Sequence, residues 1–116
     1  MKFALLIYGD EGEWRATEVE QKQMYEAHAA FGAWLEEQGW DRGGHELGSS
    51  REAATVRAEG DGFVVSDGPF VETKEQLGGV YVIECRSRDE AIEAARRLPA
   101  DIVEVRRIVE ADERPS

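Results

Sequence analysis

Two side chains in this sequence are suited to proton transfer: a histidine in a helical pattern and an aspartate in a turn. His28 follows Met24 by four residues and precedes Phe31 by three, which places the three side chains on one face of a helix. Asp67 lies in the segment SDGPF, where Gly and Pro predict a turn after a strand. Because an imidazole titrates near neutral pH and a carboxylate can orient it, His28 and Asp67 are the candidate catalytic pair.

Each member of this pair also has a purely structural interpretation. His28 can be a histidine packed between the helix and a sheet, with its polar atoms satisfied there. Asp67 can accept a hydrogen bond from the backbone two residues further on, as in an Asx-turn. The interpretations differ in whether the two side chains share a pocket.

The residues that follow this aspartate are candidates for contacting a ligand. Gly68 and Pro69 favour a tight turn, and Phe70 is expected to anchor the turn in apolar surroundings. Thr73 and Lys74 supply a hydroxyl and an ammonium group, which can bind an anionic part of a ligand. The sequence therefore predicts a small-molecule ligand near this segment.

Other kinds of chemistry find little support in the sequence. His28 and His45 have no cysteine or carboxylate at zinc-site spacing, so no metal is expected. The single cysteine, Cys85, lies in an apolar stretch predicted to be a strand and is expected to be buried. The sequence has neither a phosphate-binding glycine motif nor the Gly-x-Ser-x-Gly turn of a serine nucleophile. No cofactor is expected either.

Five segments outside the helices have readable patterns. Apolar runs at 2–8 and 79–84 predict buried strands, and 102–109 alternates in the way of a strand with one wet face. Residues 53–66 contain two short runs around EGDG, which predicts a hairpin. The segment GGHELGSS, residues 43–50, is typical of turns. Gly78 and Gly79 indicate either a positive φ or a close backbone approach.

Two helices follow from their capping residues. Thr17 and Ser87 each precede a glutamate by three positions, the spacing of a capping box. The first helix is expected to end at Gly39 and the second at Pro99. The resulting order of strand, helix, hairpin, strand, helix and strand predicts an α+β fold of the ferredoxin-like βαββαβ kind, with an elaborated middle hairpin.

Both helices of such a fold cover one face of the sheet. Because the two apolar strands carry apolar side chains on both faces, the second face needs cover that one chain cannot supply. A homodimer stacked sheet to sheet is therefore expected. Residues 1–110 are predicted to form one domain, and residues 111–116 a frayed tail.

Charge and hydropathy restrict the partners and the location. The 116 residues include 14 Lys and Arg against 25 Asp and Glu, a formal charge of −11. Such a field repels phosphate backbones, so neither nucleic acid nor an anionic membrane is an expected partner. No apolar run has the length of a membrane span or a secretory signal, which favours a cytoplasmic protein.

Residues 65–83, VSDGPFVETKEQLGGVYVI, closely resemble the signature of the DGPF subgroup of YCII-related domains, which runs close to DGPFAETKEQLGG and departs here at Val71. The opening MKFALLIYGDE and the late VEVRRI extend the resemblance over most of the chain. It implies a dimeric α+β barrel built from ferredoxin-like halves. The subgroup has no assigned reaction, but broader relatives are proposed to use a His and Asp pair in a cleft. The segment EAHAAFGAWLEEQG places that histidine at His28, and Asp67 is the natural acidic candidate.

Three functions are compatible with these features. The first is a small-molecule enzyme in which His28 and Asp67 transfer a proton. The second is a non-catalytic metabolite-binding or regulatory module, associated with a sigma-factor system because family relatives are often encoded near alternative sigma factors. The third is a purely structural dimer with an inert cavity.

Overall fold

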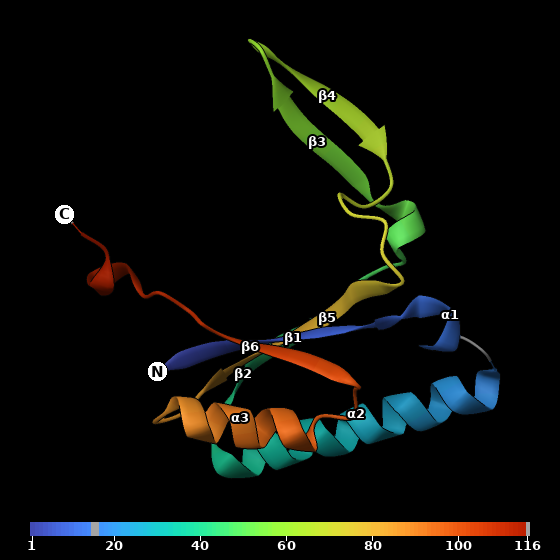
Figure 1. The fold of residues 1–116 in the computed structure, drawn as a ribbon. Coiled ribbons are helices and arrows are strands. Elements are labelled where there is room, and N and C mark those ends of the chain that lie inside the picture. Colours follow the sequence, from blue (N-terminus) through green and yellow to red (C-terminus); the bar gives the residue numbers. More distant parts are fainter. Residues whose placement is uncertain (15–16, 116) are drawn as a thin grey trace.

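The computed structural model describes residues 1–14 and 17–115, and its centre is a four-stranded antiparallel sheet. Two helices cover one face of this sheet, so that the molecule has a helical layer and a sheet layer (Figure 1). The sheet has the order β2-β5-β1-β6, which confirms the predicted ferredoxin-like α+β fold. The elements of this body are β1 (Lys2–Asp10), α1 (Glu11–Trp14), α2 (Glu18–Gln38), β2 (Asp41–Glu46), β5 (Glu75–Glu84), α3 (Arg88–Arg97) and β6 (Ile102–Arg107).

Local side-chain chemistry sets the ends of the two long helices as predicted. The Thr17 hydroxyl accepts a hydrogen bond from the backbone N–H of Glu20 at 3.1 Å, and the Ser87 hydroxyl accepts one from Glu90 at 3.2 Å. Gly39 ends α2 with φ of 75°, a left-handed conformation that glycine adopts without steric cost. These caps fix where α2 begins, and with it the position of His28 along the sheet.

The hydrophobic core lies between the helices and the sheet. Along β1, side chains alternate between fully buried and half-buried positions, because successive residues point to opposite faces. Cys85, just after β5, is buried as predicted. The buried core consists of Phe3, Leu5, Ile7, Phe31, Leu35, Ile83, Cys85, Ala91, Ala94 and Leu98.

The segment predicted as turns at 43–50 was partly misjudged, because Asp41–Glu46 forms the edge strand β2. Gly44 in this strand allows a close approach to β5. A Cβ at Gly44 would lie 3.1 Å from the ring of Tyr81 and 3.2 Å from the carbonyl oxygen of Val80. The strand therefore carries small and polar residues and lacks the apolar alternation by which strands are recognised.

The predicted hairpin is present but belongs to a separate sheet. Strands β3 (Ala54–Glu59) and β4 (Gly62–Asp67) pair only with each other, and Gly60 at the turn has φ of 59°. The short helix η1 (Ser50–Glu52) precedes the hairpin, and a second one, η2 (Ala111–Glu113), follows β6. Figure 1 shows the hairpin extending away from the body, on the side of the sheet that the helices leave uncovered.

The uncovered face of the main sheet is apolar at its centre. In register, Leu6 lies opposite Val80, and Ala4 opposite Val82. All four residues are half-buried, and they point away from the helices. The expectation of apolar side chains on both faces is therefore confirmed.

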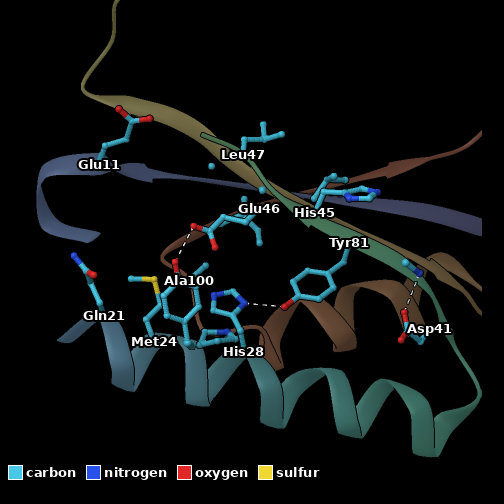
Figure 2. A pocket seen from close by; sticks show the side chains of 18 residues that line it. Glu11, Gln21, Met24, His28, Asp41, His45, Glu46, Leu47, Tyr81 and Ala100 are labelled. Carbon is cyan, nitrogen blue, oxygen red and sulfur yellow. Dashed lines mark hydrogen bonds between the residues drawn. The ribbon is translucent and has the colours of Figure 1, made fainter. Parts of the chain in front are cut away.

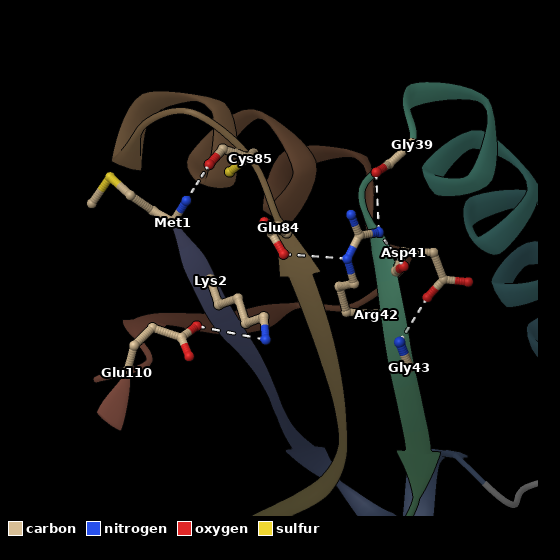
Figure 3. Close-up of polar contacts among 9 residues, drawn as sticks. All are labelled: Met1, Lys2, Gly39, Asp41, Arg42, Gly43, Glu84, Cys85 and Glu110. Atoms are coloured by element: carbon tan, nitrogen blue, oxygen red, sulfur yellow. Dashed lines mark hydrogen bonds and ion pairs between the residues drawn. The ribbon is translucent and has the colours of Figure 1, made fainter. Parts of the chain in front are cut away.

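Arg42 fastens the beginning of β2 to its surroundings. Its guanidinium donates to the carbonyl oxygen of Gly39 at 3.1 Å and to the carboxylate of Glu84 at 3.3 Å (Figure 3). At the same end of the sheet, the amino group of Met1 donates to the carbonyl oxygen of Cys85 at 2.8 Å. These contacts hold together the neighbouring ends of β1, β2 and β5. Among the helices described, none combines the length and apolar character needed to cross a membrane.

Candidate functional site

A cavity of about 620 Å³ lies between α2 and the edge of the sheet formed by β2 and β5. Its volume falls within the range of about 300 to 1,000 Å³ that is usual for small-molecule sites. Met24 and His28 enter it from α2, Tyr81 from β5, and Glu46 from β2, as Figure 2 shows. The connection between α3 and β6 contributes Ala100.

His28 and Tyr81 are hydrogen-bonded within this cavity. The Nδ1 atom of His28 lies 2.8 Å from the Tyr81 hydroxyl oxygen, and the two rings are nearly parallel, with 4° between their planes. The rings of Phe31 and Tyr81 pack at 82° with their centres 5.0 Å apart, and the missing side chain of Gly44 leaves room for the Tyr81 ring. The tyrosine is therefore held in place by packing, and it in turn orients the imidazole.

Burial shifts the proton affinities of this pair in opposite directions. Removal from water lowers the pKa of His28 below its ordinary value of 6.5, while the nearby carboxylate of Glu46 opposes the shift. Burial raises the pKa of Tyr81 above 10.0, and the charge of Asp41 raises it further. Both rings are therefore neutral at pH 7, and His28 can take up a proton from a bound molecule.

Carboxylates surround the pair and are themselves positioned. Glu46 accepts a hydrogen bond from the Tyr25 hydroxyl at 2.9 Å, and Asp41 accepts one from the backbone N–H of Gly43 at 2.9 Å. The third carboxylate in the wall, Glu11, accepts hydrogen bonds from Ser50. The described residues that line the cavity include no lysine and no arginine. Its electrostatic field therefore disfavours an anionic ligand.

The backbones of β2 and β5 pack closely on the sheet side of the cavity. A Cβ at Gly79 would lie 3.1 Å from the carbonyl oxygen of His45, because β2 and β5 approach each other here. The close approach expected at this glycine is therefore confirmed, whereas a positive φ is not found at Gly78 or Gly79. His45 alternates with Gly44 along β2, which directs its imidazole to the uncovered face of the sheet.

Of the residues predicted from the sequence, the structure places His28 in the cavity. Asp67 is exposed at the end of β4, on the projecting hairpin, and is not part of the cavity wall of this chain. Within one chain, the histidine and the aspartate are therefore not brought together. The same holds for the predicted ligand-binding residues, which lie in the connection between β4 and β5 and outside the described wall: Gly68, Pro69, Phe70, Thr73 and Lys74.

Backbone geometry explains part of this connection. Gly68 has φ of 102°, its N–H donates to the carbonyl oxygen of Ala53 at 2.6 Å, and its own carbonyl accepts from the Thr55 hydroxyl at 2.8 Å. Phe70 is 72% exposed, so the expected apolar anchoring was wrong, and the Arg57 guanidinium lies 5.2 Å from its ring centre. Thr73 donates to the carbonyl oxygen of Glu75. Gly68 and Thr73 thus have structural roles at the base of the hairpin.

Sequence reasoning missed the partner of His28. Tyr81 sits inside the apolar run GVYVIE, where it counted only as a strand former. A hydroxyl on the helix-facing side of a buried strand needs a hydrogen-bond partner, and this requirement was the available signal. Glu46 was missed because its strand was taken for a turn.

Comparison with known proteins agrees with this architecture. The family model for the YCII-related domain matches residues 1–112. An uncharacterized protein of Rhizobium meliloti (strain 1021) is 39% identical over 100 residues, which cover 84% of this chain and 80% of that protein. The family match spans the helix and strands that form the cavity as well as the projecting hairpin, and the chain belongs to the YCII-related domain family.

Proposed function

We propose that this protein is a small-molecule enzyme of the DGPF subgroup, which works as a homodimer and uses His28 to transfer a proton. The observation that carries the proposal is the 2.8 Å contact between His28 and Tyr81 inside a cavity of about 620 Å³. A half-buried neutral imidazole with one nitrogen already engaged presents its other nitrogen to a ligand. This is the arrangement that general acid–base catalysis requires.

The proton would move between the substrate and the Nε2 atom of His28. When Nδ1–H donates to the Tyr81 oxygen, Nε2 has a free lone pair and accepts a proton from the substrate. In the other tautomer the Tyr81 hydroxyl donates to Nδ1, and Nε2–H is the donor. The nearby Glu46 carboxylate stabilises the imidazolium that forms after proton uptake.

The cavity wall favours a neutral or cationic substrate of modest size. Carboxylates at Glu11, Asp41 and Glu46 attract a cation, and the rings of Tyr25 and Tyr81 offer surfaces on which an ammonium group can rest. An amine with a short apolar body fits this combination. Carboxylate and phosphate substrates would meet repulsion and no basic partner in the described wall.

Asp67 and the neighbouring ligand candidates can take part only through a second copy. Asp67 pairs with Ala54 at the base of the hairpin and lies outside the described wall of the cavity in its own chain. A role for Asp67 beside His28 therefore requires that the hairpin of one protomer reaches the cavity of the other. In that case Asp67→Asn would lower turnover, and mixed dimers of Asp67→Asn with His28→Asn chains would recover part of it.

The test is a thermal-shift screen of small amines, matched carboxylic acids and matched neutral molecules. A ligand at 100 times its dissociation constant adds about 2.7 kcal/mol to stability, which such a screen detects readily. Amines should shift the melting temperature of the wild type, and His28→Asn should retain binding but lose turnover of the substrate found among them. Binding without turnover in the wild type would instead identify a metabolite-binding or regulatory module, such as one linked to a sigma-factor system. Stabilisation by the acids alone would refute the proposed substrate class.

A further inference from the structure

The β3–β4 hairpin has one apolar face and one polar face. Residues paired across an antiparallel ladder lie on the same face, and the pairs alternate between the two faces. Val56 pairs with Val65, and Ala58 pairs with Phe63, which makes one face apolar except at its base, where Ala54 pairs with Asp67. The intervening pairs put Thr55, Ser66, Arg57, Val64 and Glu59 on the other face.

Nothing in the described part of the chain covers the apolar face. Val56 is 61% exposed, Phe63 74% and Val65 66%. An isolated two-stranded hairpin is marginal in water, and it becomes stable when its apolar face packs on another surface. A contiguous exposed apolar face on such an arm marks an interaction site.

The accessible surface of the whole chain is large enough to include the interface of a homodimer. A compact chain of 13.0 kDa has an accessible surface of about 6,300 Å² by the size scaling of folded monomers, whereas this chain exposes 8339 Å². Its radius of gyration is 16.5 Å, against about 13 Å for a compact domain of this length. The excess is about 2,000 Å² for each chain, and two chains together reach the range in which obligate homodimers bury surface.

We propose that the β3–β4 hairpin is a clasp, whose apolar face packs on a second copy of this chain. The hairpin rises on the same side of the body as the uncovered apolar face of the main sheet (Figure 1), so a copy stacked on that face lies within its reach. The paired residues Val56, Ala58, Phe63 and Val65 carry no charge, whereas Asp67 lies on the same face at the base of the hairpin. Although the chain as a whole carries −11, two copies can therefore meet at the apolar part of this face without like charges opposing each other. This inference rests on the homodimer of the proposed function and adds the contact that holds it together.

The experiment compares the same substitution on the two faces of the hairpin. Val65→Lys puts an ammonium group on the apolar face, and Val64→Lys puts one on the polar face, one residue away in the same strand. Val56→Lys repeats the test on the other strand. Dimer dissociation constants are measured by sedimentation equilibrium of the full chain, and circular dichroism follows the folding of the body, to whose core the hairpin contributes no residue.

Val65→Lys and Val56→Lys should each raise the dissociation constant at least about tenfold, because a lysine buried in an apolar contact loses its hydration. Val64→Lys should change it less than about threefold, since its face stays in water. Equal effects of the substitutions on the two faces would overturn the clasp and leave the homodimer intact. A wild type that is monomeric at micromolar concentration would overturn both the clasp and the dimer.

Discussion

The contact between His28 and Tyr81 can be measured by a double-mutant cycle. Tyr81→Phe removes the hydroxyl and keeps the ring that packs on Phe31, and His28→Leu removes the imidazole. A hydrogen bond of this kind contributes about 0.5 to 1.5 kcal/mol net. Because His28 is only half-buried, water can replace the lost hydroxyl in part, so we expect a coupling of about 1 kcal/mol. The Tyr81→Phe variant should then melt about 4 °C lower than the wild type.

The assay is urea unfolding of the four proteins of the cycle at one protein concentration, because the stability of the proposed homodimer would depend on concentration. Unfolding slopes should agree among the four, which shows that the same surface is exposed in each. If the two substitutions add to within about 0.3 kcal/mol, the side chains are not coupled, and the pair cannot be the basis of proton transfer.

Three further predictions follow from the same structure. The pKa of His28 is lowered in the folded state, so the unfolded chain binds more protons below pH 6.5; stability should therefore fall as the pH drops through 6.5, and urea titrations of His28→Asn should show a smaller fall. Leu35→Ala should cost about 3 to 4 kcal/mol in denaturant unfolding, because Leu35 is completely buried in the core. Gly79→Ala should destabilise the protein and weaken ligand binding in calorimetry, because its methyl group would meet the carbonyl oxygen of His45 and separate β2 from β5.

The predictable parts of the fold are those encoded by neighbouring residues. The caps at Thr17, Ser87 and Gly39 act within a few residues, so their sequence signals led directly to the observed helix ends. The hairpin turn at Gly60 is equally local. Strand β2 was missed because Gly44 packs against the ring of Tyr81, which is distant in the sequence. No pattern among neighbouring residues indicates such a contact.

In the candidate site, too, local features could be predicted from the sequence, and contacts between distant residues could not. The spacing of Met24, His28 and Phe31 correctly predicted that His28 faces the sheet, because this prediction depends on helical periodicity alone. Its pairing with Tyr81 joins residues 53 positions apart and depends on the register of β5. The position of Asp67, at the base of the hairpin, depends on how the separate β3–β4 sheet joins the main sheet, so sequence spacing gave no sign that the two candidate residues separate in one chain.

The segment between β2 and β5, which contains the β3–β4 hairpin, leaves the main sheet and returns to it at neighbouring backbone positions. The N–H of Leu47 donates to the carbonyl oxygen of Gly78 at 2.9 Å, which closes the ladder before the chain departs. Closing a loop costs only about 0.6 kcal/mol more for each doubling of its length. Insertions and deletions in this stretch should therefore burden the folding of the core very little, because the hairpin contributes no residue to it.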